Sequence, residues 1–135
     1  MTDFTPVNDL EQALLDGRKG HLPLNDFLKV LLRSPIHVLS GAEPQEDGSG
    51  FEPLVYPHPE EADDRMICVF SSPQRIGRFS KLAPYMMTVT CGEFLERLPD
   101  RTIGIVLNPG DEFGFELRSP AIQSLMASVR KARTN

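Results

Sequence analysis

Five consecutive apolar residues, Met66 to Phe70, constrain the fold more than any other feature of this sequence. A strand with one face in water alternates apolar and polar residues, whereas this run is apolar at both parities. We therefore expect a central strand that is covered on both faces. Such a strand needs further elements packed on each side of the sheet, so the run predicts a layered α/β domain.

The residues after this run repeat a strand–helix pattern. Tyr85–Val89 and Ile103–Leu107 are two further strand-like runs, and each connection between the three runs has room for one helix. Ser72-Pro73 is typical of a helix start, with Ser72 as the N-cap, and Thr90–Glu93 matches a capping box. Right-handed crossovers would make the three strands parallel, so these segments predict two βαβ units.

The two ends of the sequence add helices and edge strands. Apolar residues recur at helical spacing from Val7 to Leu14 and from Leu24 to Leu31, which predicts an N-terminal helical pair. Ile36–Leu39 has the pattern of a short strand. Phe113–Leu117 follows a Pro109-Gly110 turn and is expected to pair back on the preceding strand. The predicted fold class is α/β: a mixed sheet with two βαβ crossover units, a C-terminal hairpin and an N-terminal helical pair.

Charge is concentrated in one region of the chain. Residues 43–64 contain eight acidic residues and no Lys or Arg, whereas the whole chain carries −5, so the remainder carries +3. Residues 41–50 are rich in Gly, Pro and acidic residues, which predicts a mobile loop. Nucleic acid is not expected as a partner, because phosphate binding needs a basic face. No apolar stretch reaches the roughly 20 residues of a membrane span, and no secretory signal is recognised, so we expect a cytoplasmic protein.

The cysteines and histidines give little support to redox or metal chemistry. Cys68 lies in the apolar run and Cys91 at a predicted helix start, so we expect free thiols in a reducing compartment and no disulfide. A helix N-terminus lowers a thiol pKa, but no base is supplied for Cys91, which favours a structural role. The three histidines, His21, His37 and His58, lack ligand spacing. We expect no metal, no cofactor and no catalytic residue.

Two short motifs resemble a known family. Phe70–Pro73 and Leu107–Gly110 are similar, in the same order, to motifs of the N-terminal domain of the SseB family, the enhanced serine sensitivity proteins of bacteria. The likeness extends from about Leu24 to Leu125. It implies a bacterial α/β protein with one such domain over residues 1–135, and it brings no established biochemical activity. Many members have a second domain, for which this chain has no room.

The same strand ends form the best candidate site. Ser72, Thr90 and Asn108 each follow a predicted strand, so parallel strands would place them at one edge and around a shared hollow. Two of these segments open helices, whose free N–H groups attract anions, and Arg75 adds positive charge. We interpret Ser72, Arg75, Thr90 and Asn108 as a small-anion or carboxylate site. The alternative is that Ser72 and Thr90 only cap helices and Asn108 only forms a turn.

The function classes that remain are a binding module and a metabolic protein. The main hypothesis is a protein-interaction or small-ligand-binding module, whose partner is an unidentified protein or a small anionic ligand. Arg75, Arg78 and Lys81 recur every three residues and form either a docking face for an acidic partner or a solvated surface. The alternative, implied only by the family's name, is an enzyme or metabolite-handling protein linked to serine metabolism. A third hypothesis, a secretion chaperone, requires a helix-rich dimer.

Overall fold

The computed structural model describes residues 5–43, 45–46, 51–58, 61–98, 103–111 and 113–134. No helix within these residues is long and apolar enough to cross a membrane. The elements in chain order are α1 (Asp9–Arg18), α2 (Leu24–Arg33), β1 (Pro35–Ser40), β2 (Val55–His58), β3 (Glu61–Phe70), the 3-10 helices η1 (Pro73–Arg75) and η2 (Gly77–Lys81), β4 (Tyr85–Thr90), α3 (Cys91–Glu96), β5 (Gly104–Leu107), β6 (Phe115–Leu117) and α4 (Ser119–Thr134).

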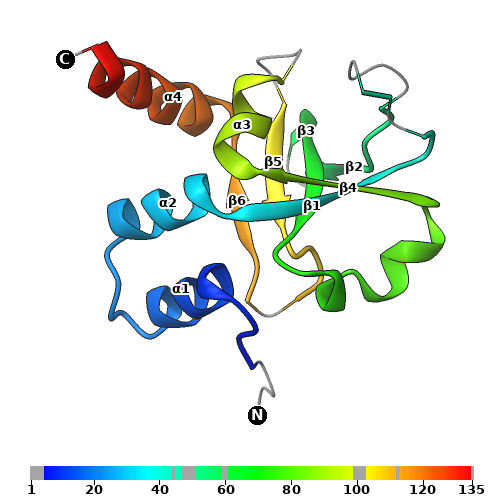
Figure 1. Ribbon diagram of the computed structural model, residues 1–135, viewed down its shortest axis with the longest axis horizontal. Coiled ribbons are helices and arrows are strands. Elements are labelled where there is room, and N and C mark those ends of the chain that lie inside the picture. Colours follow the sequence, from blue (N-terminus) through cyan, green and yellow to red (C-terminus); the bar gives the residue numbers. More distant parts are fainter. Residues whose placement is uncertain are drawn as a thin grey trace.

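One mixed sheet forms the centre of the fold, in the order β4-β1-β3-β5-β6, with β2 paired on β3. The neighbours β3 and β5 are parallel, whereas every other pair is antiparallel. Figure 1 shows β1 and β4 crossing the direction of β5 and β6 steeply, so the sheet is strongly twisted. The predicted α/β class is confirmed, together with the N-terminal helical pair and the C-terminal hairpin.

The central strand is buried on both faces, as its composition predicts. The side chains from Met66 to Phe70 are between 0% and 2% exposed. Ile67 and Val69 join a core on the face that the α-helices cover, whereas Met66 and Cys68 join a second core on the opposite face. Alternate side chains of the apolar run therefore pack into different cores, one on each face of the sheet.

The two faces of the sheet have unequal covers. All four α-helices contribute to the larger core, with α1 and α2 side by side on one flank (Figure 1). The smaller core is closed by the segment that holds η1 and η2, through Ile76, Phe79 and Ala83. The larger core therefore has an α-helical cover and the smaller core a 3-10 cover.

Two predicted features of the crossovers are corrected. The segment after β3 forms two short 3-10 helices rather than one α-helix, because Gly77 takes a left-handed conformation (φ 51°) that interrupts it. In addition, β4 runs in the same direction as β3 but is not its neighbour, since β1 lies between them and pairs with both. Connection length predicts strand direction, but the insertion of β1 depends on contacts distant in sequence.

The predicted helix caps also differ from the observed ones. Neither Ser72 nor Thr90 caps its helix through its side chain. Glu93 does not complete a capping box but pairs with Arg97 at 2.9 Å, and the N–H of Cys91 donates to the Ser34 carbonyl. The predicted mobile loop covers residues 41–50. Of these, residues 44 and 47–50 lie outside the described residues.

Candidate functional site

A buried carboxylate occupies the place where the sequence predicts an anion site. Glu11, in the first turn of α1, has a fully buried side chain at 0% exposure. Its position follows from local capping, because the N-cap Asn8 accepts a hydrogen bond from the Glu11 N–H at 2.9 Å. The Val7 N–H in turn donates to Glu11 Oε1 at 3.1 Å. The start of α1 therefore holds this carboxylate in one orientation.

Side chains at the end of β3 donate to both oxygens of this carboxylate. Ser71 Oγ and Ser72 Oγ donate to Glu11 Oε2 at 2.6 Å and 2.8 Å. Arg75 binds it with two nitrogens: Nε reaches Oε2 at 3.2 Å and Nη2 reaches Oε1 at 2.8 Å. A carboxylate with this many donors is fully satisfied, which explains how a charged group can be buried here.

The end of β5 completes the cluster through Asn108. Its Oδ1 accepts from the Ser71 N–H at 3.0 Å, and its Nδ2 donates to Ser71 Oγ at 2.9 Å. Asn8 Nδ2 donates to the Ser71 carbonyl at 2.8 Å. Ser71 therefore connects α1, β3 and the β5 turn. We call Asn8, Glu11, Ser71, Ser72, Arg75 and Asn108 the Glu11 cluster.

The turn that carries Asn108 needs special backbone conformations. Asn108 has a positive φ of 53° and Gly110 one of 81°, and the Asp111 N–H donates to the Asn108 carbonyl at 3.0 Å. Gly110 thus takes the position of a type II turn that requires φ > 0, as predicted, and asparagine tolerates the left-handed region. The turn aims the amide of Asn108 back into the fold, where it is 1% exposed.

The electrostatics of the cluster favour an ionised carboxylate. Burial raises the pKa of Glu11, but the hydrogen bonds from Arg75, Ser71, Ser72 and Val7 outweigh burial and lower this pKa to about 2. The hydrogen bond to Glu11 raises the pKa of Arg75. The two charges hold each other ionised and neutralise each other locally.

The structure brings together three of the four residues that the sequence predicts for the site. Ser72, Arg75 and Asn108 belong to the Glu11 cluster, at the edge where β3 and β5 end. Thr90 is exposed, lies beyond β1, and lines a different hollow of about 290 Å³. The strand ends share an edge as predicted, but Thr90 and Asn108 line separate hollows.

The predicted site lacks three members of the cluster, Asn8, Ser71 and Glu11, and of these Glu11 carries the charge. Asn8-x-x-Glu11 before an apolar run is the local signature of a helix start and was visible in the sequence. Its contact with Ser71 joins residues 60 positions apart, and no local pattern indicates that. Arg75 binds this carboxylate instead of standing with Lys81 on a solvated ridge.

The thiols show no sign of activation. Burial raises the pKa of Cys91 to about 12 and that of Cys68 to about 11. Both are buried and free in the structure. Within the residues described, no three His, Cys, Asp or Glu side chains gather as metal ligands.

A cavity of about 550 Å³ lies next to the Asn108 turn, between α1, α2 and β6. Its apolar walls include Leu14, Phe27 and Phe115, and the two rings are 4.9 Å apart. Arg18 crosses its rim and donates from Nη2 to the Gly114 carbonyl at 2.8 Å. The volume is in the range of small-molecule sites.

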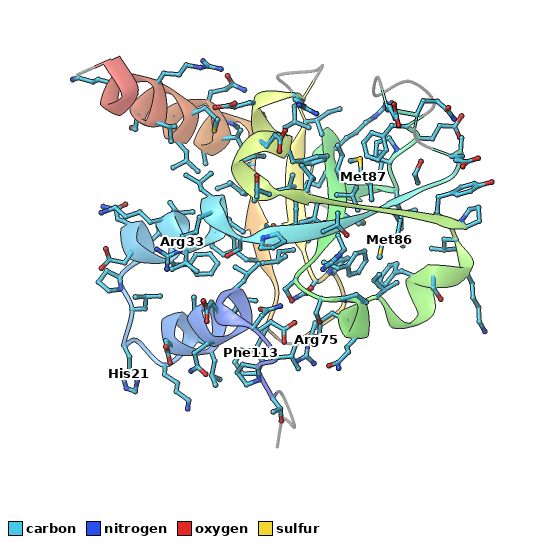
Figure 2. All side chains as sticks on the ribbon, in the orientation of Figure 1. His21, Arg33, Arg75, Met86, Met87 and Phe113 are labelled. Atoms are coloured by element: carbon cyan, nitrogen blue, oxygen red, sulfur yellow. The ribbon has the colours of Figure 1, made fainter. Side chains whose placement is uncertain are left out.

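The outer edge of β4 is the second open feature. In Figure 2, Met86 and Met87 project from this strand, which crosses the front of the molecule. Leu82, Tyr85 and Met86 are 63%, 39% and 46% exposed and lie within five residues of each other. We call Leu82 together with strand β4 the β4 edge. Among the described strands, only β1 pairs with β4, so one side of it is open.

The register tells which backbone groups of β4 face outward. The Cys91 N–H donates to the Ser34 carbonyl, and this pair continues the β1–β4 ladder by one position. Hydrogen-bonded pairs alternate along an antiparallel ladder. The odd-numbered residues of β4 therefore direct their N–H and C=O groups at β1, whereas Met86 and Thr88 direct theirs away from the sheet.

Comparison with known proteins identifies the family. Residues 10–124 match the family model of the SseB protein N-terminal domain. No curated protein and no solved structure matches the chain. The match includes the end of β3, the turn after β5 and Glu11, whereas Asn8 of the Glu11 cluster precedes it. The chain therefore belongs to the SseB family, through that family's N-terminal domain.

Proposed function

We propose that this domain is a protein-interaction module that binds an extended segment of a partner along the β4 edge. The observation that carries the proposal is the open side of β4, where Met86 and Thr88 direct backbone donors and acceptors outward. An extended polypeptide satisfies such groups by adding a strand to the sheet.

The composition of β4 supports this function. Natural edge strands are usually protected by charged side chains, prolines, bulges or a cover. The six residues Tyr85–Thr90 contain no charged side chain and no proline, and their pairing with β1 is regular. Exposed Leu82, Tyr85 and Met86 add an apolar surface beside the open backbone groups. An edge that is both unprotected and apolar fits a surface that a partner covers.

The other functions have less support. The Glu11 carboxylate holds the donors that an external anion would use, so a small anionic ligand would have to displace it. Both thiols are buried and protonated, which does not favour nucleophilic catalysis in serine metabolism or elsewhere. The mixed sheet is not the helix-rich sandwich that a secretion chaperone requires. Free cysteines fit a bacterial protein in the reducing cytoplasm, where we propose that the domain acts.

The 550 Å³ cavity supports one second candidate, a small and largely apolar ligand bound between α1, α2 and the Asn108 turn. Gly17 offers a way to separate the two candidates. It lines this cavity, and a Cβ added there has nothing within 4 Å. Gly17→Leu therefore adds a side chain at the wall of the cavity, and its Cβ meets no backbone atom.

The test uses two matched variants of the tagged domain. Thr88→Lys places a charge on the β4 edge, and Gly17→Leu alters the wall of the cavity. We expect Thr88→Lys to lose the proteins that the wild type captures, and Gly17→Leu to keep them, with both variants folded by circular dichroism. If Gly17→Leu loses the captured proteins and Thr88→Lys keeps them, binding depends on the cavity and not on the β4 edge.

A further inference from the structure

We infer that the segment bound at the β4 edge is β4 of a second copy of this chain, so that two domains form one continuous sheet about a two-fold axis. This inference rests on the proposed function, since it names the partner at the same edge. A symmetric pair of identical strands must be antiparallel, and β4 can pair with itself in that way.

The backbone groups of β4 limit the register of this pairing. Hydrogen-bonded positions must join residues that face outward on both copies, which are the even-numbered residues Met86, Thr88 and Thr90. Centring the axis on Met87 pairs Met86 of one copy with Thr88 of the other, and the reverse. Met86 and Thr88 of each copy then exchange hydrogen bonds in an antiparallel ladder. An axis centred on Met86 would place Pro84, which lacks an N–H, opposite Thr88. An axis centred on Thr88 would pair Met86 with Thr90, but it would place Tyr85 opposite Cys91, where β4 has ended and α3 begins.

The side chains fit the same register. Tyr85, Met87 and Val89 share one face of β4, and Met87 and Val89 already pack on the edge of the larger core. Across the axis, Tyr85 would lie opposite Val89 of the other copy, and Met87 opposite Met87. Aromatic and β-branched neighbours are favourable cross-strand pairs. The second copy therefore extends the larger core with side chains of the same kind.

The charge distribution permits this contact although each chain carries −5. The excess of acidic residues lies within residues 43–64, and the strand at the axis has no charged side chain. No like charges are brought directly opposite each other along β4, which would weaken a strand pair. A second copy therefore supplies an uncharged strand whose side chains fit β4 across a two-fold axis.

Mass and crosslinking test the arrangement. We expect light scattering to give twice the monomer mass of 15.1 kDa for wild type and Gly17→Leu, and the monomer mass for Thr88→Lys. Met87→Cys should form an interchain disulfide, because non-hydrogen-bonded partners have Cα atoms about 4.5 Å apart. Thr88→Cys is the control, since its equivalents lie diagonally at about 7–8 Å. The native cysteines are buried and remain in both variants.

Each outcome separates the two proposals. A monomer at concentrations into the millimolar range, with partner capture still lost in Thr88→Lys, would overturn the second copy and keep the proposed function. A doubled mass that survives Thr88→Lys would place the dimer contact elsewhere and overturn the inference. Crosslinking of Thr88→Cys in preference to Met87→Cys would overturn the register centred on Met87. A monomer whose partners bind Thr88→Lys unchanged would overturn both.

Discussion

At the residue scale, Glu11 gives a role to the serine and asparagine side chains that follow β3 and β5 in this chain. Ser72 and Asn108 are good capping and turn residues, so their types alone predict local roles. In the fold they are instead members of the Glu11 cluster, with Ser71 and Arg75. These residue types indicate a site for an anion. They do not indicate that the anion is the carboxylate of Glu11, because Glu11 lies on α1, 60 positions from Ser71 in the sequence.

Replacing the buried carboxylate tests this role. Glu11→Gln keeps the size of the side chain but removes the charge that satisfies Arg75, whose side chain is only 17% exposed. Breaking a buried ion pair by removing one partner costs about 3 kcal/mol or more in the free energy of unfolding. Glu93→Gln is the control, because its pair with Arg97 is 47% and 74% exposed and contributes about 0.5 kcal/mol or less. Urea denaturation of both variants measures the difference, and equal losses would contradict a special role for Glu11.

At the element scale, strand direction followed from the sequence but strand order did not. Connection lengths predict that β3, β4 and β5 run the same way, and they do. The place of β1 between β3 and β4 depends on pairing with residues more than 30 positions away, such as Val38 with Val69. The 3-10 segment was missed for a different reason, because Gly77 can take either a helical or a left-handed conformation until its surroundings select one.

Proline substitutions in β4 test which backbone groups face outward. Met87→Pro removes an N–H that is directed at β1, and we expect it to lower stability by about 3 kcal/mol, measured by thermal unfolding of dilute protein. Thr88→Pro removes an outward N–H and the exposed contact of Thr88 Oγ1 with His37 Nδ1. We expect this variant to lose about 1 kcal/mol of stability. Equal losses, or a larger loss for Thr88→Pro, would reverse the assigned register.

Glycine positions test how closely β5 approaches β6 and α4. A Cβ at Gly104 would lie 2.6 Å from the Leu117 carbonyl oxygen and 3.0 Å from the Arg118 Cα, both backbone atoms. We expect Gly104→Ala to destabilise the domain by about 1–3 kcal/mol. Gly17→Ala is the control, because a Cβ at this position in α1 has nothing within 4 Å. Alanine should raise the free energy of unfolding there by about 0.5–1 kcal/mol. A neutral Gly104→Ala in chemical denaturation would show that this junction can open.

At the scale of the whole molecule, the Glu11 cluster joins the N-terminal helix to the sheet by polar contacts, in addition to the apolar contacts of Leu10 and Leu14. The two-sided core around β3 could be predicted, because a strand that is buried on both faces has consecutive apolar residues. The attachment of α1 could not, since hydrogen bonds between distant residues leave no periodic pattern. The stability of the domain should therefore respond to pH through this attachment.

The response has a defined direction. Glu11 has a pKa of about 2 in the folded chain and an ordinary value of 4.5, so between these values the unfolded state binds more protons. The stabilisation is fully present above pH 4.5 and is lost as the pH falls towards 2, by about 3 kcal/mol in total. Glu11→Gln cannot take up this proton. Urea unfolding from pH 7 to pH 2 should therefore show the gap between wild type and Glu11→Gln closing below pH 4.5, while the gap between wild type and Gly17→Ala stays constant. Parallel curves for wild type and Glu11→Gln would mean that the carboxylate is not held by Arg75 and the serines in solution.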